Sequence, residues 1–187
     1  MVDKAKENQF IAAVHEILVP AGWDPLIPYA HAAHESGWFE KMVGLNNFWG
    51  LQYPRTQWRR DTIDLEPIRI PTTEYITSGR AAADPKWFAG WINYHLEDMI
   101  RISYDTRLER FKFGVYKKFC DWSREPLAVK YYGAHIKSLW PEAYANRQNA
   151  ERYFPGLFND DYKFATDDPE EYCKNCMSIY RQLKAAL

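Results

Sequence analysis

The sequence predicts a mainly α-helical fold that also contains a small β-rich segment. Near the N-terminus, Phe10, Val14 and Ile17 recur at helical intervals. This periodicity is lost over residues 48–77, where β-forming residues and prolines dominate, and it returns after Pro85. We therefore expect one domain over residues 1–187, with a β-lobe at about residues 48–80.

Capping residues indicate where the first helices begin and end. A helix over residues 4–19 should stop at Pro20. The next helix should begin after Asp24, with Pro25 in its first turn, and should stop at Gly37. Three further helices are predicted, at residues 107–120, 126–139 and 142–153.

The last helix has a clear start, with Asp167 or Asp168 as its cap and Pro169 in the first turn. The β-rich segment should contain short strands joined by turns near Asp64 and Pro71. Residues 48–53, which follow a turn at Asn46 and Asn47, also have the composition of a strand.

Composition and charge narrow the possible functions. The net charge of −1 implies no charge-driven affinity for nucleic acid or for a membrane surface. Aromatic residues make up 17% of the chain, which suits a surface that stacks against sugar rings as well as a Trp-rich core. Cys120, Cys173 and Cys176 form no complete disulfide framework, and their spacing suggests no metal site or cofactor.

Glu35 is the strongest candidate for a catalytic residue. It falls in the last turn of the second predicted helix, close to Trp38, Trp49 and the Asn-Asn turn. A glutamate at a helix end is usually solvated, and a neighbouring tryptophan usually belongs to the core. Aromatic side chains that exclude water would instead raise the pKa of the carboxyl group, as a general acid requires. His31, four residues earlier, should share the same helix face.

Four motifs resemble a known family. Glu35-Ser36-Gly37-Trp38 and Asn46-Asn47-Phe48-Trp49-Gly50-Leu51 resemble the ESGWG and NNLFGIK signature of glycoside hydrolase family 73. These glucosaminidases are peptidoglycan hydrolases and include flagellar and autolysin enzymes. Further similarity lies in Thr73-Glu74-Tyr75 (T-x-E-Y), in Trp87–Trp91 (F-R-x-Y) and in Ala165–Pro169 with Tyr172 (A-T-D-P-x-Y). The motifs occur in the family order over about residues 10–187.

The resemblance implies a lysozyme-like fold with a cleft between a helical lobe and a β-hairpin lobe. The implied reaction is hydrolysis of the β-1,4 bond after N-acetylglucosamine, with Glu35 as general acid. Glu74 would be the base that activates water if the enzyme inverts. Asp64 and Glu66 are rivals for that role, and a substrate-assisted route would need no second carboxylate.

The same resemblance suggests residues that bind the glycan: Trp38, Asn47, Trp49, Tyr75, Trp91 and Tyr94. Trp91 stands where the family has tyrosine, so the aromatic hydroxyl near the acid is either missing or supplied by Tyr94. The expected partner is a peptidoglycan glycan strand, bound by a monomer without a cofactor or metal. Neither a signal peptide nor an apolar run of membrane-spanning length is visible. We expect action at the bacterial cell wall, whether extracellular, periplasmic or phage-delivered.

Three other functions remain open at this stage. A muramidase or lytic transglycosylase would share the helix-end glutamate but cut the other glycosidic bond. A non-catalytic glycan-binding or virion structural protein would need neither Glu35 nor Glu74. A metal-dependent peptidase would use His31, His34 and Glu35, although the H-E-x-x-H order is absent.

Overall fold

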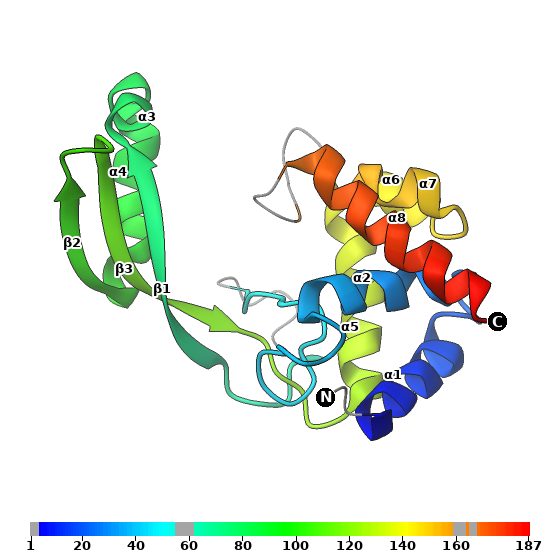
Figure 1. Cartoon of the computed structure of the whole chain (residues 1–187). Helices are drawn as coiled ribbons and strands as arrows, with labels where there is room; N and C mark the ends of the chain where they lie inside the picture. The colour runs from blue at the N-terminus through cyan, green and yellow to red at the C-terminus, as the bar shows by residue number, and fades with distance from the viewer. Residues whose placement is uncertain (1–3, 55–61, 159–163, 165–167) are drawn as a thin grey trace. The chain divides into compact units, whose positions relative to one another are not determined.

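The computed structural model describes residues 4–54, 62–158, 164 and 168–187 (Figure 1). The chain divides into two compact units, the first made of Met1–Glu66 and Cys120–Leu187 and the second of Pro67–Phe119. The second unit is therefore inserted between two segments of the first. It begins later than the predicted β-lobe at residues 48–80 and extends much further along the chain.

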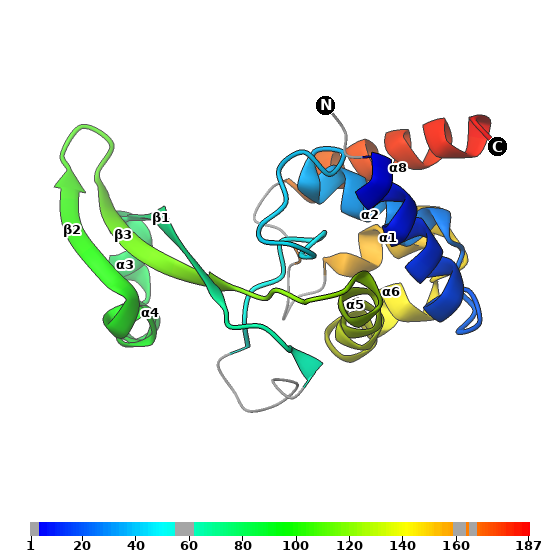
Figure 2. The ribbon, with the colours of Figure 1, turned by 90° about the horizontal axis from the view of Figure 1, so that it is seen from below.

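The first unit is helical. Helix α2 packs against α8, and α1 packs against α5, so segments from both ends of the sequence share one core (Figures 1 and 2). That core is rich in aromatic side chains, including Phe10, Trp49, Tyr132 and Tyr153. The elements are α1 (Lys4–Ile17), α2 (Leu26–Ser36), α5 (Glu125–Leu139), α6 (Pro141–Ala145), α7 (Ala150–Tyr153), the 3-10 helix η3 (Pro155–Leu157) and α8 (Pro169–Ala185).

Several predicted helix boundaries are confirmed. Gly37 adopts a left-handed conformation (φ +56°) and its N–H reaches the carbonyls at the end of α2, so it is the predicted stop. The Asp168 carboxylate accepts hydrogen bonds from the N–H groups of Glu170 and Glu171, and Pro169 opens α8. The predicted helix over residues 142–153 is instead two short helices, α6 and α7.

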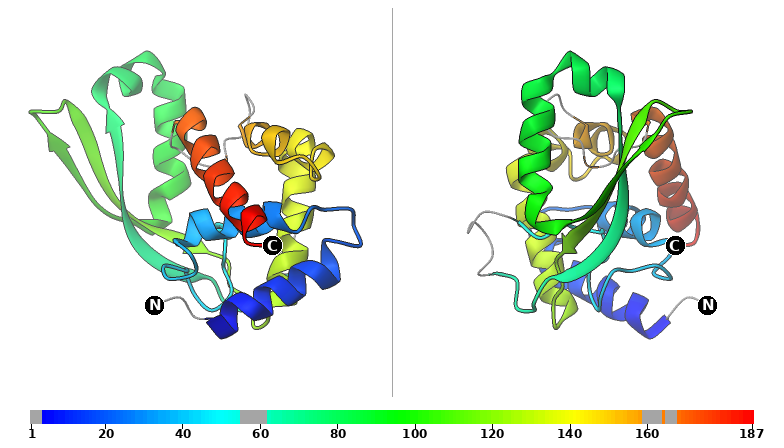
Figure 3. Two further views of the ribbon diagram at one scale, coloured as in Figure 1. Left: turned by 45° about the vertical axis from the view of Figure 1, so that its right-hand side comes forward. Right: turned by 90° about the vertical axis from the view of Figure 1, so that its left-hand side faces the viewer.

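The second unit is an antiparallel sheet of order β1-β3-β2 with helices on one face (Figure 3). Trp87, Phe88 and Trp91 of α4 pack against Phe113 and its neighbours on that face. Asp98, which is buried, joins this layer to the sheet through ion pairs with Arg69 and Lys118. The elements are β1 (Ile68–Thr77), α3 (Ser78–Ala83), α4 (Pro85–His95), the 3-10 helix η2 (Leu96–Asp98), β2 (Met99–Asp105) and β3 (Arg110–Phe119).

The prediction of a helix over residues 107–120 is wrong, because most of these residues form strand β3. Phe111, Phe113 and Val115 alternate with other residues and face the core of the second unit. A short apolar run of this kind fits a helix or a strand, and here the long pairing with β1 favours the strand.

Two predicted features of the β-rich segment are also wrong. Pro71 does not mark a turn but lies inside the continuous strand β1, which is an edge strand and tolerates a missing N–H. Residues 48–53 do not form the predicted strand: Phe48 and Trp49 lie in a turn, and the buried side chains of this segment pack in the helical core. Within the described residues, no helix is both long and apolar enough to cross a membrane.

Candidate active site

Glu35 lies in the last turn of α2, and its side chain is 21% exposed. The chain turns sharply after it, because Gly37, Trp38 and Phe39 have positive φ angles of 56°, 59° and 67°. Such angles are unfavourable for residues other than glycine, by roughly 1–2 kcal/mol each. Ser36 helps to hold the turn, since its hydroxyl oxygen accepts a hydrogen bond from Phe39 N–H (2.8 Å).

Helix α8 brings a second functional group to Glu35. The hydroxyl of Tyr172 donates a hydrogen bond to Glu35 Oε1. The same hydroxyl lies 2.8 Å from His31 Nε2, which is itself 4.0 Å from Glu35 Oε1. The predicted proximity of His31 and Glu35 on one helix face is therefore confirmed, and Tyr172 lies between them.

His31 is fully buried and uses both of its ring nitrogens. Its Nδ1 atom lies 2.7 Å from the hydroxyl of Tyr132, which in turn lies 2.5 Å from the hydroxyl of Tyr153. Burial, together with the nearby imidazole of His34, lowers the pKa of His31 well below its usual value. Burial also raises the pKa of Tyr172 well above its usual value, so His31 and Tyr172 are neutral at physiological pH.

The arrangement of His31 does not suit a metal site, because tyrosine hydroxyls contact both ring nitrogens. In the part of the chain that the structure describes, no group of three or more His, Cys, Asp or Glu side chains is arranged to hold a metal ion.

The Asn-Asn turn is fixed by the segment that follows the second unit. Buried Asp121 accepts hydrogen bonds from the N–H groups of Leu45 and Asn46 (both 2.9 Å to Oδ1). The Asn47 side-chain amide donates to the carbonyls of Leu51 and Cys120, also at 2.9 Å. The Asn47 side chain thus links these two segments. Because it is buried, contact with a glycan would require the residues around it to move.

The two tryptophans near Glu35 have different environments. Trp49 is 1% exposed and stacks on Tyr132, with 3.9 Å between ring centroids and 8° between ring planes. It therefore supports the helical core and presents no face to solvent. Trp38 is only partly buried and meets Tyr29 edge-on at 6.5 Å, so it remains available as a sugar-binding surface.

Glu74 and three predicted glycan-binding residues lie in the second unit. Glu74 is half-buried in β1 and pairs with Lys117 of β3, with 2.6 Å between Oε1 and Nζ. Its cross-strand neighbour Phe113 packs against Trp91 at 4.7 Å between ring centroids, so Glu74 and Trp91 share one face of the sheet.

Tyr75 lies on the opposite face from Glu74, because successive residues of a strand alternate. Its ring is 48% exposed and carries the Arg110 guanidinium 3.9 Å above it. Tyr94, on α4, is 52% exposed. In the second unit, Glu74 and Trp91 therefore lie on one face of the sheet, and Tyr75 lies on the other.

Asp64 and Glu66, the other candidates for the catalytic base, are less suited to that role. Asp64 accepts hydrogen bonds from the N–H and the hydroxyl of Ser123. Although partial desolvation opposes the effect, these bonds lower the pKa of Asp64. Asp64 therefore has a local structural role in the first unit, whereas Glu66 is exposed at the end of that segment.

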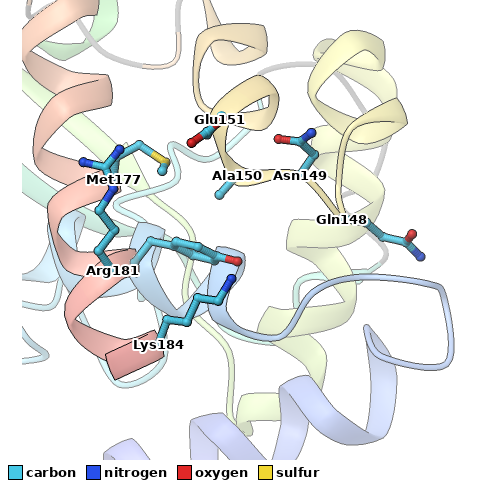
Figure 4. Close-up of a pocket in the computed structure, with 8 residues that line it drawn as sticks. Gln148, Asn149, Ala150, Glu151, Met177, Arg181 and Lys184 are labelled. Atoms are coloured by element: carbon cyan, nitrogen blue, oxygen red, sulfur yellow. The ribbon is translucent and has the colours of Figure 1, made fainter. Parts of the chain in front are cut away.

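A pocket of about 300 Å³ lies between α8 and the segment that leads into α7 (Figure 4). Arg181 and Lys184 contribute from α8, and Glu151 contributes from the opposite side. The lining contains neither Glu35 nor any of the predicted glycan-binding residues. This pocket is therefore separate from the candidate acid.

No family model and no curated protein matches the chain. Among solved structures, the glycoside hydrolase domain of FlgJ from Salmonella typhimurium matches with a TM-score of 0.58 and 19% identity, covering 100% of this chain and 91% of that one. A C-terminally truncated form of that domain matches at 0.50 and 21%, covering 96% and 93%. The catalytic domain of the autolysin Auto from Listeria monocytogenes gives 0.48 and 11%, covering 97% and 81%.

This chain has the fold of the FlgJ glycoside hydrolase domain. The predicted α+β class, mainly helical with a small antiparallel sheet, is confirmed. The family resemblance that the sequence motifs indicate is confirmed at the level of the FlgJ-like fold.

Sequence reasoning missed part of the surroundings of Glu35. Tyr172 was visible only as a motif position, and nothing in the sequence links it to a carboxylate 137 residues away. Tyr132 and Tyr153 gave no signal, because a tyrosine in a helical pattern is usually core. Asp121 was also missed, although its three N–H donors make it central to the Asn-Asn turn.

Proposed function

We propose that this protein is a peptidoglycan hydrolase that cleaves the β-1,4 bond after N-acetylglucosamine, with Glu35 as general acid. One observation carries the proposal: a partly exposed glutamate at a helix end receives a hydrogen bond from a buried tyrosine, within a fold like that of the FlgJ glycoside hydrolase domain. An acid of this kind must meet the leaving oxygen while its carboxyl group is held in a fixed orientation.

The chemistry assigns a separate role to each carboxyl group. Glu35 donates its proton to the glycosidic oxygen as the bond to the anomeric carbon breaks. Glu74 takes a proton from the water that attacks that carbon, so the reaction inverts the anomeric configuration. The ion pair with Lys117 supports this assignment, because a base must be in the ionised form.

We infer that the whole chain acts as one catalytic domain and that the substrate is a glycan strand of the bacterial cell wall. Trp38 is our first candidate for a sugar-stacking residue in the first unit, since it is partly exposed three residues after Glu35. In the second unit, Trp91 and Tyr94 are assigned to glycan binding with Glu74, and Tyr75 is assigned to a contact on the other face of the sheet.

The proposal is tested by digesting purified peptidoglycan and identifying the new reducing ends by mass spectrometry. N-acetylglucosamine at the reducing end is the expected result. Muramic acid would indicate a muramidase, anhydromuramic acid would indicate a lytic transglycosylase, and either result would overturn the assigned bond. Binding to cell walls without turnover would instead indicate a non-catalytic glycan-binding protein. A run with a metal chelator serves as a control, since the proposed chemistry uses no metal.

A further inference from the structure

We propose that the buried imidazole of His31 is a positioning residue for Glu35 and acts through Tyr172. The inference rests on the proposed role of Glu35 as general acid. It concerns a continuous chain of hydrogen bonds to which four helices, α7, α5, α2 and α8, contribute side chains. In order, the chain runs through Tyr153, Tyr132, His31, Tyr172 and Glu35.

The end of the chain at Glu35 fixes the direction of its bonds. The single hydroxyl hydrogen of Tyr172 goes to Glu35 Oε1, so the Tyr172 oxygen must accept from His31 Nε2. A neutral imidazole carries one N–H, and therefore His31 Nδ1 is an acceptor. The hydrogen of Tyr132, 2.7 Å away, must then point to Nδ1. His31 is thus held in the Nε2–H tautomer.

The end of the chain at Tyr153 favours the same direction. With Tyr132 donating to His31, the hydroxyl of Tyr153 donates to the oxygen of Tyr132 at 2.5 Å. Reversing the chain would leave the Tyr153 hydrogen without an acceptor, because Tyr132 is its one hydrogen-bond partner among the described residues. Tyr153 is fully buried, so water cannot replace that acceptor. The buried end therefore selects one direction for the whole chain.

This direction has a consequence for the acid. With the bonds in this direction Glu35 Oε1 accepts from Tyr172, so the proton that Glu35 donates is carried by Oε2. A carboxyl group with one oxygen anchored in this way is held in a fixed orientation, as general acid catalysis requires. His31 supplies this orientation without touching substrate, because it is fully buried.

The surroundings of His31 keep the chain neutral. Phe164 lies against the imidazole ring, with 4.4 Å between ring centroids, and contributes no charge. Burial raises the pKa of the Cys176 thiol, so this neighbour on α8 is uncharged as well. Among the described residues, the titratable groups around His31 are His34 and Glu35 on α2, Tyr132 on α5, Tyr153 on α7, and Tyr172 and Cys176 on α8.

The first test reads the tautomer directly in the resting, full-length protein. Two-bond ¹H–¹⁵N correlation spectra of the imidazole rings should show His31 with hydrogen on Nε2 and none on Nδ1. The signals should not titrate between about pH 5 and 8. Tyr132→Phe removes the donor to Nδ1 and should shift the ¹⁵N resonance of that nitrogen, while Tyr172 still keeps the hydrogen on Nε2. A wild-type Nδ1–H tautomer, or a His31 that titrates in this range, would overturn the proposal.

A matched control is available on the same helix. Tyr131→Phe also removes one buried hydroxyl from α5, but Tyr131 is not part of the chain. This variant should keep the wild-type ¹⁵N resonance of His31 Nδ1. An equal shift of that resonance in Tyr131→Phe and Tyr132→Phe would indicate general loosening of the core, and it would count against the proposal.

The second test measures turnover. His31→Leu should lower kcat on the order of tenfold to a hundredfold while leaving KM nearly unchanged, because Glu35 loses its fixed orientation. His31→Gln should keep kcat closer to the wild-type value than His31→Leu does. The glutamine amide supplies a donor for Tyr172 and an acceptor for Tyr132, in place of Nε2–H and Nδ1. A purely structural role for His31 would not produce this split between kcat and KM or this rescue.

Failure of this inference can be told apart from failure of the proposed function. The proposed function fails if Glu35→Gln keeps its activity. The role of His31 fails if Glu35→Gln is inactive while His31→Leu turns over as fast as the wild type. If His31→Leu does not fold, the tautomer of the wild-type protein still decides the question.

Discussion

Trp49 and Tyr132 lie face to face in the helical unit, with ring centroids 3.9 Å apart and ring planes 8° from parallel. The stack joins the segment of the Asn-Asn turn to helix α5. The indole Nε1 of Trp49 also donates a hydrogen bond to the carbonyl of Pro28 on α2, at 3.3 Å. Trp49 thus supports two elements that carry members of the hydrogen-bond chain behind Glu35.

Trp49→Ala should mainly destabilise the protein. Removing a buried aromatic ring typically costs about 3–5 kcal/mol, and we expect the free energy of unfolding in urea to fall by that amount. Trp38→Ala is the matched control. Because Trp38 is only partly buried, this substitution should lower the free energy of unfolding less and weaken glycan binding more. Unchanged stability in Trp49→Ala, together with weaker binding to cell walls, would contradict this placement of Trp49 in the core.

Glu35→Gln should abolish hydrolysis and leave the fold intact. The amide has the size of the carboxyl group and can still accept from Tyr172, but it cannot deliver a proton. General acid catalysis contributes roughly 10²–10⁴-fold, so turnover should drop at least by that factor. Release of soluble glycan from purified cell walls measures the rate, and binding to the same walls confirms that the variant is folded. More than a tenth of the wild-type rate would remove Glu35 from the role of acid.

Glu74→Gln should also cut turnover strongly if Glu74 is the base, and added azide should restore it with a defined anomeric product. Glu97→Gln is a suitable control, since Glu97 is an exposed glutamate of the same unit. A wild-type rate in Glu74→Gln would pass the role to Asp64, to Glu66 or to the acetamido group of the substrate.

Asp121→Ala should destabilise the Asn-Asn turn. Its carboxylate accepts from the N–H groups of Leu45, Asn46 and Trp122, and the buried donors would lose their partner. Hydrogen bonds to a charged group contribute about 1.5–3 kcal/mol each, so a loss of at least that size is expected in urea denaturation. A change below about 0.5 kcal/mol, the range of a neutral surface substitution, would show that the turn holds without Asp121.

The pH dependence of stability should report on His31. Burial lowers the pKa of His31 well below its usual value, so the folded protein keeps this ring neutral. In the unfolded chain the ring has a pKa near ~6.5 and takes up a proton in acid. The unfolded state therefore binds more protons below that pH, and the free energy of unfolding must fall as the pH drops.

Comparison with His31→Gln isolates this contribution from the other histidines. Between about pH 7.5 and 5.5, the wild type should lose about 1–1.5 kcal/mol more than the variant, as measured by urea denaturation. An identical pH dependence in both proteins would mean that His31 is protonated equally in the folded and unfolded states.

The sequence predicted the parts of this structure that local chemistry decides. Gly37 ends α2 because a left-handed residue suits a helix stop, and Asp168 with Pro169 starts α8 for similarly local reasons. Strand β3 was missed because the apolar residues around Phe113 fit two periodicities, and only the distant pairing with β1 selects one.

The same division applies to the candidate site. His31 and Glu35 are close because they are four residues apart on one helix, which the sequence alone shows. The contact between Glu35 and Tyr172 joins residues 137 positions apart, and it depends on how α8 packs on α2. Trp49 looked equally suited to a sugar and to a core, and only its stack on Tyr132 distinguishes the two.

The division of the helical unit into two chain segments determines the order in which the protein can be assembled during synthesis. The second unit has all of its strands once residue 119 has been made. At that point α2 still lacks Tyr132 and Tyr172, because both follow the insertion. Glu35 therefore acquires its hydrogen bond from Tyr172 only when α8 leaves the ribosome, and a nascent chain that stops before this helix carries the candidate acid without that bond.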